Sequence, residues 1–271
     1  MKIAIIGGAG NMGRWLCRFE IEEGVEVIVA DKSAENLKKL PGSDLIEKTT
    51  DSAEAATKAR FIIISVPIDR FEEAVKEIAP HVQPGSIVMD LSSVKARPVA
   101  LMHQYFPGCT VVGAHPLFGH NVTRLQDQNI VFTPAGEKDM GFALALKRFF
   151  EERGAHVKIM DAEAHDKMMA VVQGLSHFTA IAAADALAGL GDLKDMKEIS
   201  TTTFRIFLNY IESVIGDDPE LYAAIQMEHP EMKDIYQRLT EGVEKFARWV
   251  ENKDAKAFVN RMRELKGFLG K

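Results

Sequence analysis

The sequence predicts an α/β fold in two domains, a doubly wound, mainly parallel sheet followed by an all-helical domain. In the first 160 residues, short runs rich in valine and isoleucine alternate with amphipathic helical segments. This alternation is typical of parallel strands that helices cover on both faces. After residue 161 no further strand-like run occurs, and apolar residues recur at helical spacing. We therefore expect one domain over residues 1–160 and a second over residues 161–271.

The expected strands of the first domain are the apolar runs at 2–7, 25–30, 61–66, 86–91, 110–114, 130–134 and 156–160. Amphipathic helices are expected between most of them, for example at 12–23, 69–79 and 138–152. The expected helical segments of the second domain are 165–190, 198–215, 219–227 and 231–268.

Two of the expected helices carry wide apolar surfaces. The segment 168–187 is apolar on almost all sides, which predicts a central, buried helix. The last segment has an apolar stripe that includes Leu239, Val243 and Phe246. Such a stripe needs a partner, either within the chain or in a second copy of it.

Composition limits the kinds of protein that this chain can be. The 271 residues are 46% hydrophobic, which is enough for the cores of two domains. A net charge of −6 disfavours a nucleic-acid partner. The apolar run 61–66 is too short to span a membrane, and the first residues lack the features of a signal peptide. Cys17 and Cys109 are expected to be buried free thiols, so we expect a soluble, cytoplasmic protein.

The segment IAIIGGAGNMG joins the first strand to the first helix. Gly8 is expected to permit the tight turn, Gly10 to let the backbone approach a pyrophosphate, and Gly13 to let the helix pack on the strand. The free N–H groups and partial positive charge of the helix N-terminus favour such an anion. Glycines also occur in turns that bind nothing, but here strand, spacing, helix and a following acid occur together. The segment therefore predicts a Rossmann-type dinucleotide-binding domain.

Asp31 ends the second strand, where a carboxylate can bind both ribose hydroxyls of the adenosine. It would repel a 2′-phosphate, so NAD is expected over NADP, although the adjacent Lys32 weakens that preference. Pro67 follows another strand at its carboxyl end, where it either lines the cofactor or only ends the strand. The full set of predicted cofactor-binding residues is Gly8, Ala9, Gly10, Asn11, Met12, Gly13, Asp31, Lys32, Ser65, Val66 and Pro67.

Polar residues follow two further strands, Ser92, Ser93 and Lys95 after one and His115 after the next. Because parallel strands share a carboxyl edge, these groups are expected to lie together near the nicotinamide. His115 could be a structural histidine or a general base, which its ordinary pKa near 6.5 permits at neutral pH. A metal site shared with His120 is not expected, because no cysteine or suitably spaced acid completes a ligand set.

Three residues of the predicted helical domain are also candidate functional residues. Gln173 and His177 lie one helical turn apart on an apolar helix. Arg205 lies in another apolar helix, where a buried guanidinium would need a counter-charge. It could form a structural salt bridge, or it could bind a substrate carboxylate in bidentate fashion.

Taken together, these segments resemble the prephenate dehydrogenase family and its arogenate-using members. The resemblance extends nearly end to end, over the glycine loop with Asp31, DLSSVK, GAHPLFGH, EAHDKMMAVVQGLSHF and FRIFLNYIESVIGDDPELYAAIQM. It implies NAD-dependent oxidative decarboxylation of prephenate to 4-hydroxyphenylpyruvate in tyrosine biosynthesis. It also implies a homodimer whose helical halves intertwine, with the active site between the domains.

The resemblance further implies a role for each polar residue of the site. His115 would bond the substrate hydroxyl, and Ser93 would orient His115 or the nicotinamide. Lys95 would hold a substrate carboxylate or the reacting face, and Arg205 would bind a substrate carboxylate in a cavity that it shares with His115. The predicted catalytic residues are His115, Ser93 and Lys95, and the predicted substrate-binding residues are Arg205, His177, Gln173 and Ser92.

Three other functions compete with this one. Arogenate dehydrogenase would be favoured by an acid placed to meet the substrate ammonium, and we identify none in the sequence. A different two-domain reductase could use Lys167 as its catalytic lysine, but the HPLFGH segment would then have no explanation. A non-catalytic dinucleotide sensor or scaffold would need the glycine loop and the dimer helices, but not His115, Lys95 and Arg205 together.

Overall fold

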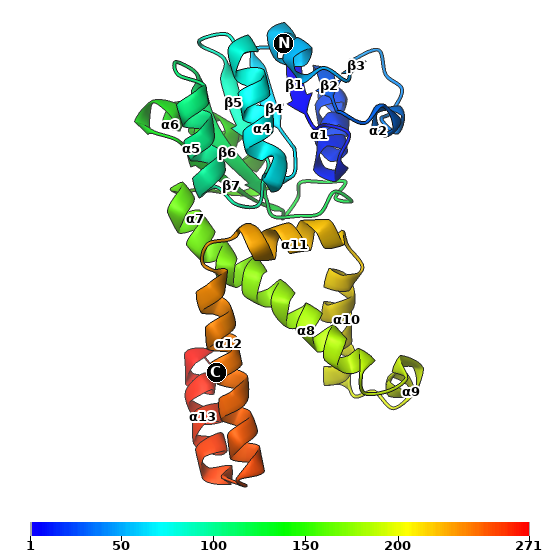
Figure 1. Cartoon of the computed structure of the whole chain (residues 1–271), viewed down its shortest axis with the longest axis vertical. Coiled ribbons are helices and arrows are strands. Elements are labelled where there is room, and N and C mark those ends of the chain that lie inside the picture. Colours follow the sequence, from blue (N-terminus) through cyan, green and yellow to red (C-terminus); the bar gives the residue numbers. More distant parts are fainter. Residues whose placement is uncertain (1, 271) are drawn as a thin grey trace. The chain divides into compact units, whose positions relative to one another are not determined.

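The computed structural model describes residues 2–270, which divide into two compact units (Figure 1). The first, which we call the sheet unit, contains the residues up to Met169 and the segment 218–229. The second, the helical unit, contains residues 170–217 and the chain from Pro230 onward. The sequence predicted a division at residue 160. In the structure the next helix, α7 (Ala162–Met169), packs against α5 (Ala96–Tyr105) and β7 (Asn129–Pro134), so the sheet unit extends to Met169.

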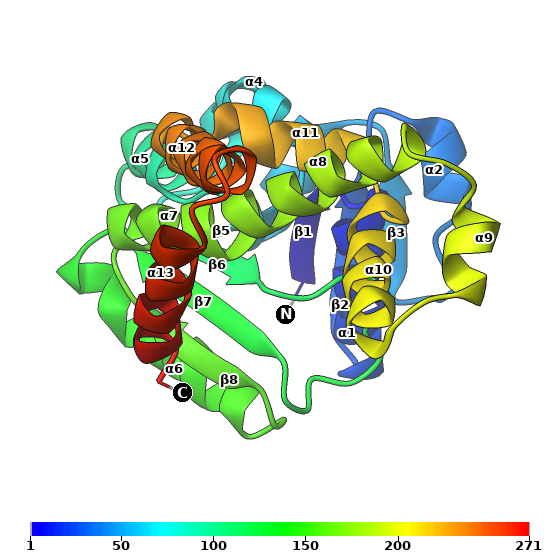
Figure 2. The ribbon, with the colours of Figure 1, turned by 90° about the horizontal axis from the view of Figure 1, so that it is seen from below.

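Within the described residues, the strands of the sheet unit form one eight-stranded sheet in the order β3-β2-β1-β4-β5-β6-β7-β8. All neighbours are parallel except β6 and β7, so the predicted doubly wound, mainly parallel sheet is confirmed. Figure 2 shows β6, β7 and β8 side by side. The strands are β1 (Lys2–Ile6), β2 (Glu26–Ala30), β3 (Ile46–Thr49), β4 (Phe61–Ile64), β5 (Ile87–Asp90), β6 (Thr110–Pro116), β7 (Asn129–Pro134) and β8 (His156–Ile159).

The edge strand β3 was missed, because its sequence IEKT is polar and only half-buried. In the central strand β1, by contrast, both faces are buried. Ile3 and Ile5 pack into the core on one side of the sheet, and Ala4 and Ile6 pack into the core on the other. Successive side chains of a strand point to opposite faces, so an all-apolar strand requires helices on both sides.

Those helices come largely from the segments between the strands. The helices of the sheet unit are α1 (Asn11–Glu22), α2 (Ala34–Lys38), α3 (Ser52–Lys58), α4 (Ile68–Ile78), α5 (Ala96–Tyr105), α6 (Glu137–Glu151), α7 (Ala162–Met169) and α11 (Pro219–Glu228), with a 3₁₀ turn at Ala79–His81. Trp15 and Leu16 of α1 join the core on one face, and Phe71 and Val75 of α4 join the core on the other.

In the helical unit, the described residues form no strand, as predicted. The predicted single helix over 231–268 is divided, because Lys253 adopts a left-handed conformation (φ 57°) and Asp254 caps the helix that follows. The elements of this unit are a π-helical turn (Ala170–Leu175), α8 (Ser176–Ala188), α9 (Leu193–Glu198), α10 (Thr202–Ile215), α12 (Met232–Glu251) and α13 (Ala255–Phe268).

The prediction that 168–187 forms a buried helix is wrong for the single chain. Among the described residues of α8, only Ala180 is buried. Val171 and Val172, in the turn that precedes α8, are about half exposed. An apolar surface on all sides requires cover, and residues 2–270 do not supply it. By length and composition alone, the helical stretch 162–188 could also cross a membrane, which was not predicted from the sequence.

Candidate active site

The glycine loop lies between β1 and α1 and is held against the end of β2. Gly7 has φ +73°, and a Cβ on it would lie 2.6 Å from Val66 Cγ1 and 2.8 Å from Ser65 O. Gly7 therefore makes the turn that the sequence analysis assigned to Gly8. Gly8 instead packs in the core, where a Cβ would lie 2.7 Å from Val29 Cγ1.

Close packing brings the start of α1 onto this loop. A Cβ on Gly13 would lie 2.5 Å from Gly8 Cα, so a glycine is needed there, as predicted. Gly10 is the exposed N-cap residue, and among the described residues no side chain caps α1 and no acid lies in its first turn. The helix N-terminus is therefore suited to an anion.

Three more of the predicted cofactor-binding residues lie around this terminus. Ala9 is fully buried, and its carbonyl accepts a hydrogen bond from Arg14 at 2.9 Å. Asn11 and Met12 are half-buried in the first turn, where Asn11 Oδ1 accepts from the same guanidinium at 2.8 Å. Arg14 thereby ties the loop to the helix, a contact that the sequence did not suggest.

Asp31 connects the end of β2 to the glycine loop. One of its carboxylate oxygens accepts from the backbone N–H of Ala9 at 3.1 Å, and the other accepts from Ser33 N–H at 2.9 Å. Lys32 forms ion pairs with Glu73 at 2.9 Å and Glu77 at 3.4 Å. Two carboxylates of α4 therefore already neutralise the cation that was expected to weaken the preference for NAD.

Ser65, Val66 and Pro67 follow β4 at its carboxyl end. Ser65 N–H donates to Ile6 O at 2.7 Å, which extends the pairing of β4 with β1 up to the glycine loop. Pro67 is exposed and is the N-cap residue of α4. This segment lies where the strand order reverses between β1 and β4, the position at which doubly wound sheets bind ligands.

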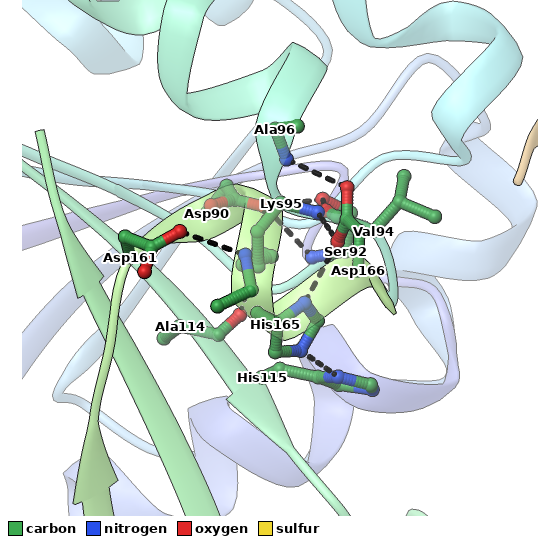
Figure 3. Close-up of polar contacts among 11 residues, drawn as sticks. Asp90, Ser92, Val94, Lys95, Ala96, Ala114, His115, Asp161, His165 and Asp166 are labelled. Atoms are coloured by element: carbon green, nitrogen blue, oxygen red, sulfur yellow. Dashed lines mark hydrogen bonds and ion pairs between the residues drawn. The ribbon is translucent and has the colours of Figure 1, made fainter. Parts of the chain in front are cut away.

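A second group of polar residues gathers at the carboxyl ends of β5 and β6 (Figure 3). Lys95 is 0% exposed, its ammonium pairs with Asp90, and it also donates to Ala114 O at 2.9 Å. Burial lowers the pKa of Lys95, and Asp90 opposes that shift. The expected contact of Lys95 with a substrate carboxylate is therefore corrected, because its ammonium is enclosed in the protein and bonded to Asp90.

The two serines next to this ion pair differ. Ser92 N–H donates to Asp90 at 2.9 Å, and Ser92 Oγ lies within hydrogen-bonding distance of Asp90 and of Val94 O. Ser92 therefore hydrogen-bonds to the Asp90 carboxylate, which leaves it engaged within the protein rather than with a substrate. Ser93 is half-buried on the same turn.

His115 lies in β6 and is 3% exposed. Its Nδ1 lies 2.9 Å from His165 Nε2, and His165 Nδ1 lies 2.7 Å from Asp166 Oδ1. Burial holds the pKa of His115 well below its ordinary value, and positive charge on His165 or Lys95 lowers it further. The imidazole is therefore neutral at pH 7, as a general base must be.

His165 and Asp166 were not singled out in the sequence, although they belong to the EAHDKMM segment. Both are buried on α7, which packs against β7 and α5. Adjacent histidine and aspartate are common on helices, and no spacing rule connects them to His115, fifty residues earlier. Their part in the site is visible only in the tertiary structure.

The remaining predicted residues belong to the helical unit. Arg205 is exposed on α10, where it donates to Ser200 O at 3.2 Å and lies 3.4 Å from Thr202 Oγ1. Its guanidinium has no carboxylate partner among the described residues, so of the two alternatives the structural salt bridge is not found. Gln173 is half-buried in the π-helical turn. His177 is half-buried in the first turn of α8, where burial lowers its pKa and Asp217 opposes the shift.

Comparison with protein families gives two matches that together cover most of the chain. Residues 18–159 match the nucleotide-binding domain of prephenate dehydrogenase, and residues 161–264 match its dimerization domain. The chain belongs to the prephenate dehydrogenase family. The family and the order of its domains are therefore confirmed as predicted. The glycine loop lies before the first matched residue, so its assignment depends on the geometry described above.

Curated relatives in this family differ in the substrates that their names give. The chain is 34% identical to a probable arogenate/prephenate dehydrogenase of Methanocaldococcus jannaschii over 97% of its own length, and it spans 60% of that relative. It is 27% identical to a 4-amino-4-deoxyprephenate dehydrogenase of Streptomyces pristinaespiralis over 99% of its length and 91% of the relative.

Solved structures of the family share the fold. Prephenate dehydrogenase of Aquifex aeolicus, in complex with hydroxyphenyl propionate and NAD+, matches with a TM-score of 0.78 at 23% identity, over 98% of this chain and 96% of that one. Synechocystis arogenate dehydrogenase matches with a TM-score of 0.72 at 22% identity, over 98% of both chains.

Proposed function

We propose that this member of the prephenate dehydrogenase family catalyses the NAD-dependent oxidative decarboxylation of prephenate to 4-hydroxyphenylpyruvate. The observation that carries the proposal is a neutral, buried histidine, His115, at the same sheet edge as a dinucleotide-type glycine loop. A non-catalytic dinucleotide sensor would need the loop but has no use for a base held in this way.

The cofactor residues of this chain fit NAD. Gly10 leaves the backbone open to a pyrophosphate, and the N-terminus of α1 offers it N–H groups. The Asp31 carboxylate accepts two backbone hydrogen bonds and retains acceptor capacity for two ribose hydroxyls. When bound, NAD supplies the acceptor for a hydride.

The proposed chemistry balances without net release of a proton. His115 takes the proton of the substrate hydroxyl while hydride leaves the same carbon and the carbon–oxygen double bond forms. The bond from the ring to its carboxylate then breaks, carbon dioxide departs, and the ring becomes aromatic. The proton returns from His115 to the oxygen, so the base is regenerated. Ser93 is proposed to orient His115 or the nicotinamide.

Arg205 is proposed to bind a carboxylate of the substrate. Its guanidinium is exposed and has no acidic partner among the described residues, so it is available for a bidentate interaction. His177 and Gln173, which lie in the same unit, are proposed to line the substrate site. Lys95 and Ser92 have no direct contact with the substrate in this proposal, because each is engaged with Asp90.

A second copy of the chain is proposed to cover the apolar surface of the helical unit. Val171, Val172, Ile206 and Phe207 are exposed there, and residues 161–264 match a dimerization domain. We propose a cytoplasmic homodimer with no membrane or nucleic-acid partner. Light scattering on purified protein in detergent-free buffer tests this proposal. It predicts twice the monomer mass, and a monomer or a detergent-dependent aggregate would contradict it.

The enzymatic proposal is tested by mixing the purified protein with NAD and prephenate and following the absorbance of the reduced cofactor. Parallel reactions use arogenate, 4-amino-4-deoxyprephenate and NADP. We expect reduced cofactor and carbon dioxide in equal amounts, fastest with prephenate and NAD. A higher rate with arogenate would assign the arogenate activity instead. No product with any pair between about pH 6 and about pH 9 would favour the sensor.

A further inference from the structure

Three buried side chains form a continuous chain of hydrogen bonds in the sheet unit (Figure 3). Asp166 and His165 come from one turn of α7, and His115 comes from β6. The distance from Asp166 Oδ1 to His165 Nδ1 is 2.7 Å, and that from His165 Nε2 to His115 Nδ1 is 2.9 Å. The order carboxylate, imidazole, imidazole is therefore set by the fold.

The direction of these hydrogen bonds follows from the carboxylate end. Asp166 also accepts from the backbone N–H of Lys95 at 2.7 Å and of Ala96 at 2.9 Å, and an amide N–H can only donate. Burial raises the pKa of Asp166, but the hydrogen bonds from His165 and from the two amides lower it below its ordinary value. Asp166 is therefore an ionised acceptor with both oxygens engaged.

The acceptor role of Asp166 determines which nitrogen donates in each of the two imidazole rings. Because Asp166 accepts, His165 Nδ1 carries the hydrogen and donates it. In the neutral form of His165, one ring nitrogen donates and the other accepts, so its Nε2 is the acceptor. The neighbouring His115 Nδ1 must then donate, and the lone pair of His115 lies on Nε2.

We infer that Asp166 and His165 are positioning residues that hold His115 in its Nδ1-protonated tautomer, with Nε2 as the nitrogen that receives the substrate proton. The inference rests on the proposed function, because only a reaction that removes a proton needs such a base. The wrong tautomer would present an N–H, which cannot accept a proton.

The proton that catalysis places on His115 is held weakly. When Nε2 of His115 gains a proton, burial and the nearby Lys95, itself paired with Asp90, disfavour the imidazolium. The proton is therefore readily returned to the oxygen of the product.

The tautomer itself can be measured on the wild-type protein with nitrogen-15-labelled histidine by NMR, with or without NAD. Signals of His115 are assigned by their loss in His115→Asn. We expect a protonated, pyrrole-type Nδ1 and an unprotonated, pyridine-type Nε2. The opposite pattern overturns the inference. Because this readout needs no turnover, it is independent of whether prephenate is the substrate.

Variants of the chain then test its effect on catalysis. Asp166→Asn replaces an acceptor by an amide whose NH₂ faces a donor, and His165→Phe removes the link to His115. In each we expect kcat to fall roughly 10- to 100-fold, a part of what a general base contributes, with KM and NAD affinity changed by less than about threefold. We also expect the His115 nitrogen signals to shift toward a mixture of tautomers in both variants.

Asp139→Asn is the matched control. Asp139 is also a buried carboxylate, but it lies on α6 and accepts a hydrogen bond from Val111 N–H at 3.1 Å. It should lower stability as Asp166→Asn does, with kcat and the His115 signals unchanged. Equal losses of kcat in the two aspartate variants, or unchanged kcat in Asp166→Asn and His165→Phe, would mean that the chain is structural only. If a variant does not fold, the tautomer of His115 measured in the wild-type protein still confirms or overturns the inference.

Discussion

The sheet unit and the helical unit hold their candidate site residues in opposite ways. In the sheet unit, His115, Lys95 and His165 are at most 3% exposed, and each is bonded to a named neighbour. In the helical unit Arg205 is exposed, and the apolar residues around it, such as Ile206, are exposed too. Packing within one chain thus determines the protonation state of the proposed base, whereas the helical unit leaves its candidate residues exposed, as the proposed substrate and second copy require.

This contrast leads to predictions that separate chemistry from binding. The largest effect is expected for His115→Asn, which removes the proposed base. Turnover should fall roughly 100- to 10,000-fold, since that is the contribution of a positioned general base. NAD affinity, measured by titration calorimetry, should stay nearly unchanged, because the glycine loop and Asp31 are intact. Loss of NAD binding would show that His115 has been assigned the wrong role.

The next largest effect is expected on the stability of the sheet unit. Lys95→Met leaves the buried Asp90 carboxylate without its cation, which should cost about 3–5 kcal/mol of unfolding free energy. Urea unfolding followed by circular dichroism measures this loss. The double variant Lys95→Met with Asp90→Leu should recover much of it, because both buried charges are then absent. A Lys95→Met protein as stable as wild type would contradict the buried ion pair.

A smaller effect is expected for the helical unit, and it should be confined to binding. Arg205→Leu should raise the KM for prephenate roughly 10- to 100-fold, which is the loss of a charge-assisted hydrogen bond of about 1.5–3 kcal/mol. The melting temperature should not change, because the guanidinium is exposed and forms no ion pair within residues 2–270. Arg205→Lys keeps the charge but cannot bind a carboxylate in bidentate fashion, so its KM should lie between those of wild type and Arg205→Leu. A lower melting temperature with an unchanged KM would restore the structural interpretation.

The sequence predicted the sheet unit better than the helical unit, and the reason is physical. Strand periodicity and the spacing from Gly8 to Gly13 are local signals, so the sheet and the close contact of Gly13 were correct. The tight turn was predicted at Gly8 but lies at Gly7. The loop reads Gly-Gly-Ala-Gly from residue 7 to residue 10, and only the backbone conformation shows which glycine makes the turn.

Errors elsewhere arose where burial depends on distant contacts. Lys95 was expected at the substrate, but Asp90 and the Ala114 carbonyl draw it inward. His165 was overlooked, because its contact with His115 spans fifty residues and joins a helix to a strand. Arg205 was expected to be buried, since the helix around it is apolar, yet that apolar surface is itself exposed in the chain.

The pH dependence of kcat/KM tests most directly whether the sheet unit holds a neutral base. Among the described residues, the charged or titratable groups that act on His115 include His165, which is bonded to Asp166 on α7, and Lys95, which is paired with Asp90 at the end of β5. Burial, His165 and Lys95 lower the pKa of His115, so protonation should inactivate the enzyme only well below its ordinary value. We predict that kcat/KM stays constant from about pH 8 down to below about pH 6.5 and then falls as a single group takes up a proton. A fall that begins at or above about pH 6.5, or one that persists unchanged in His115→Asn, would contradict the account.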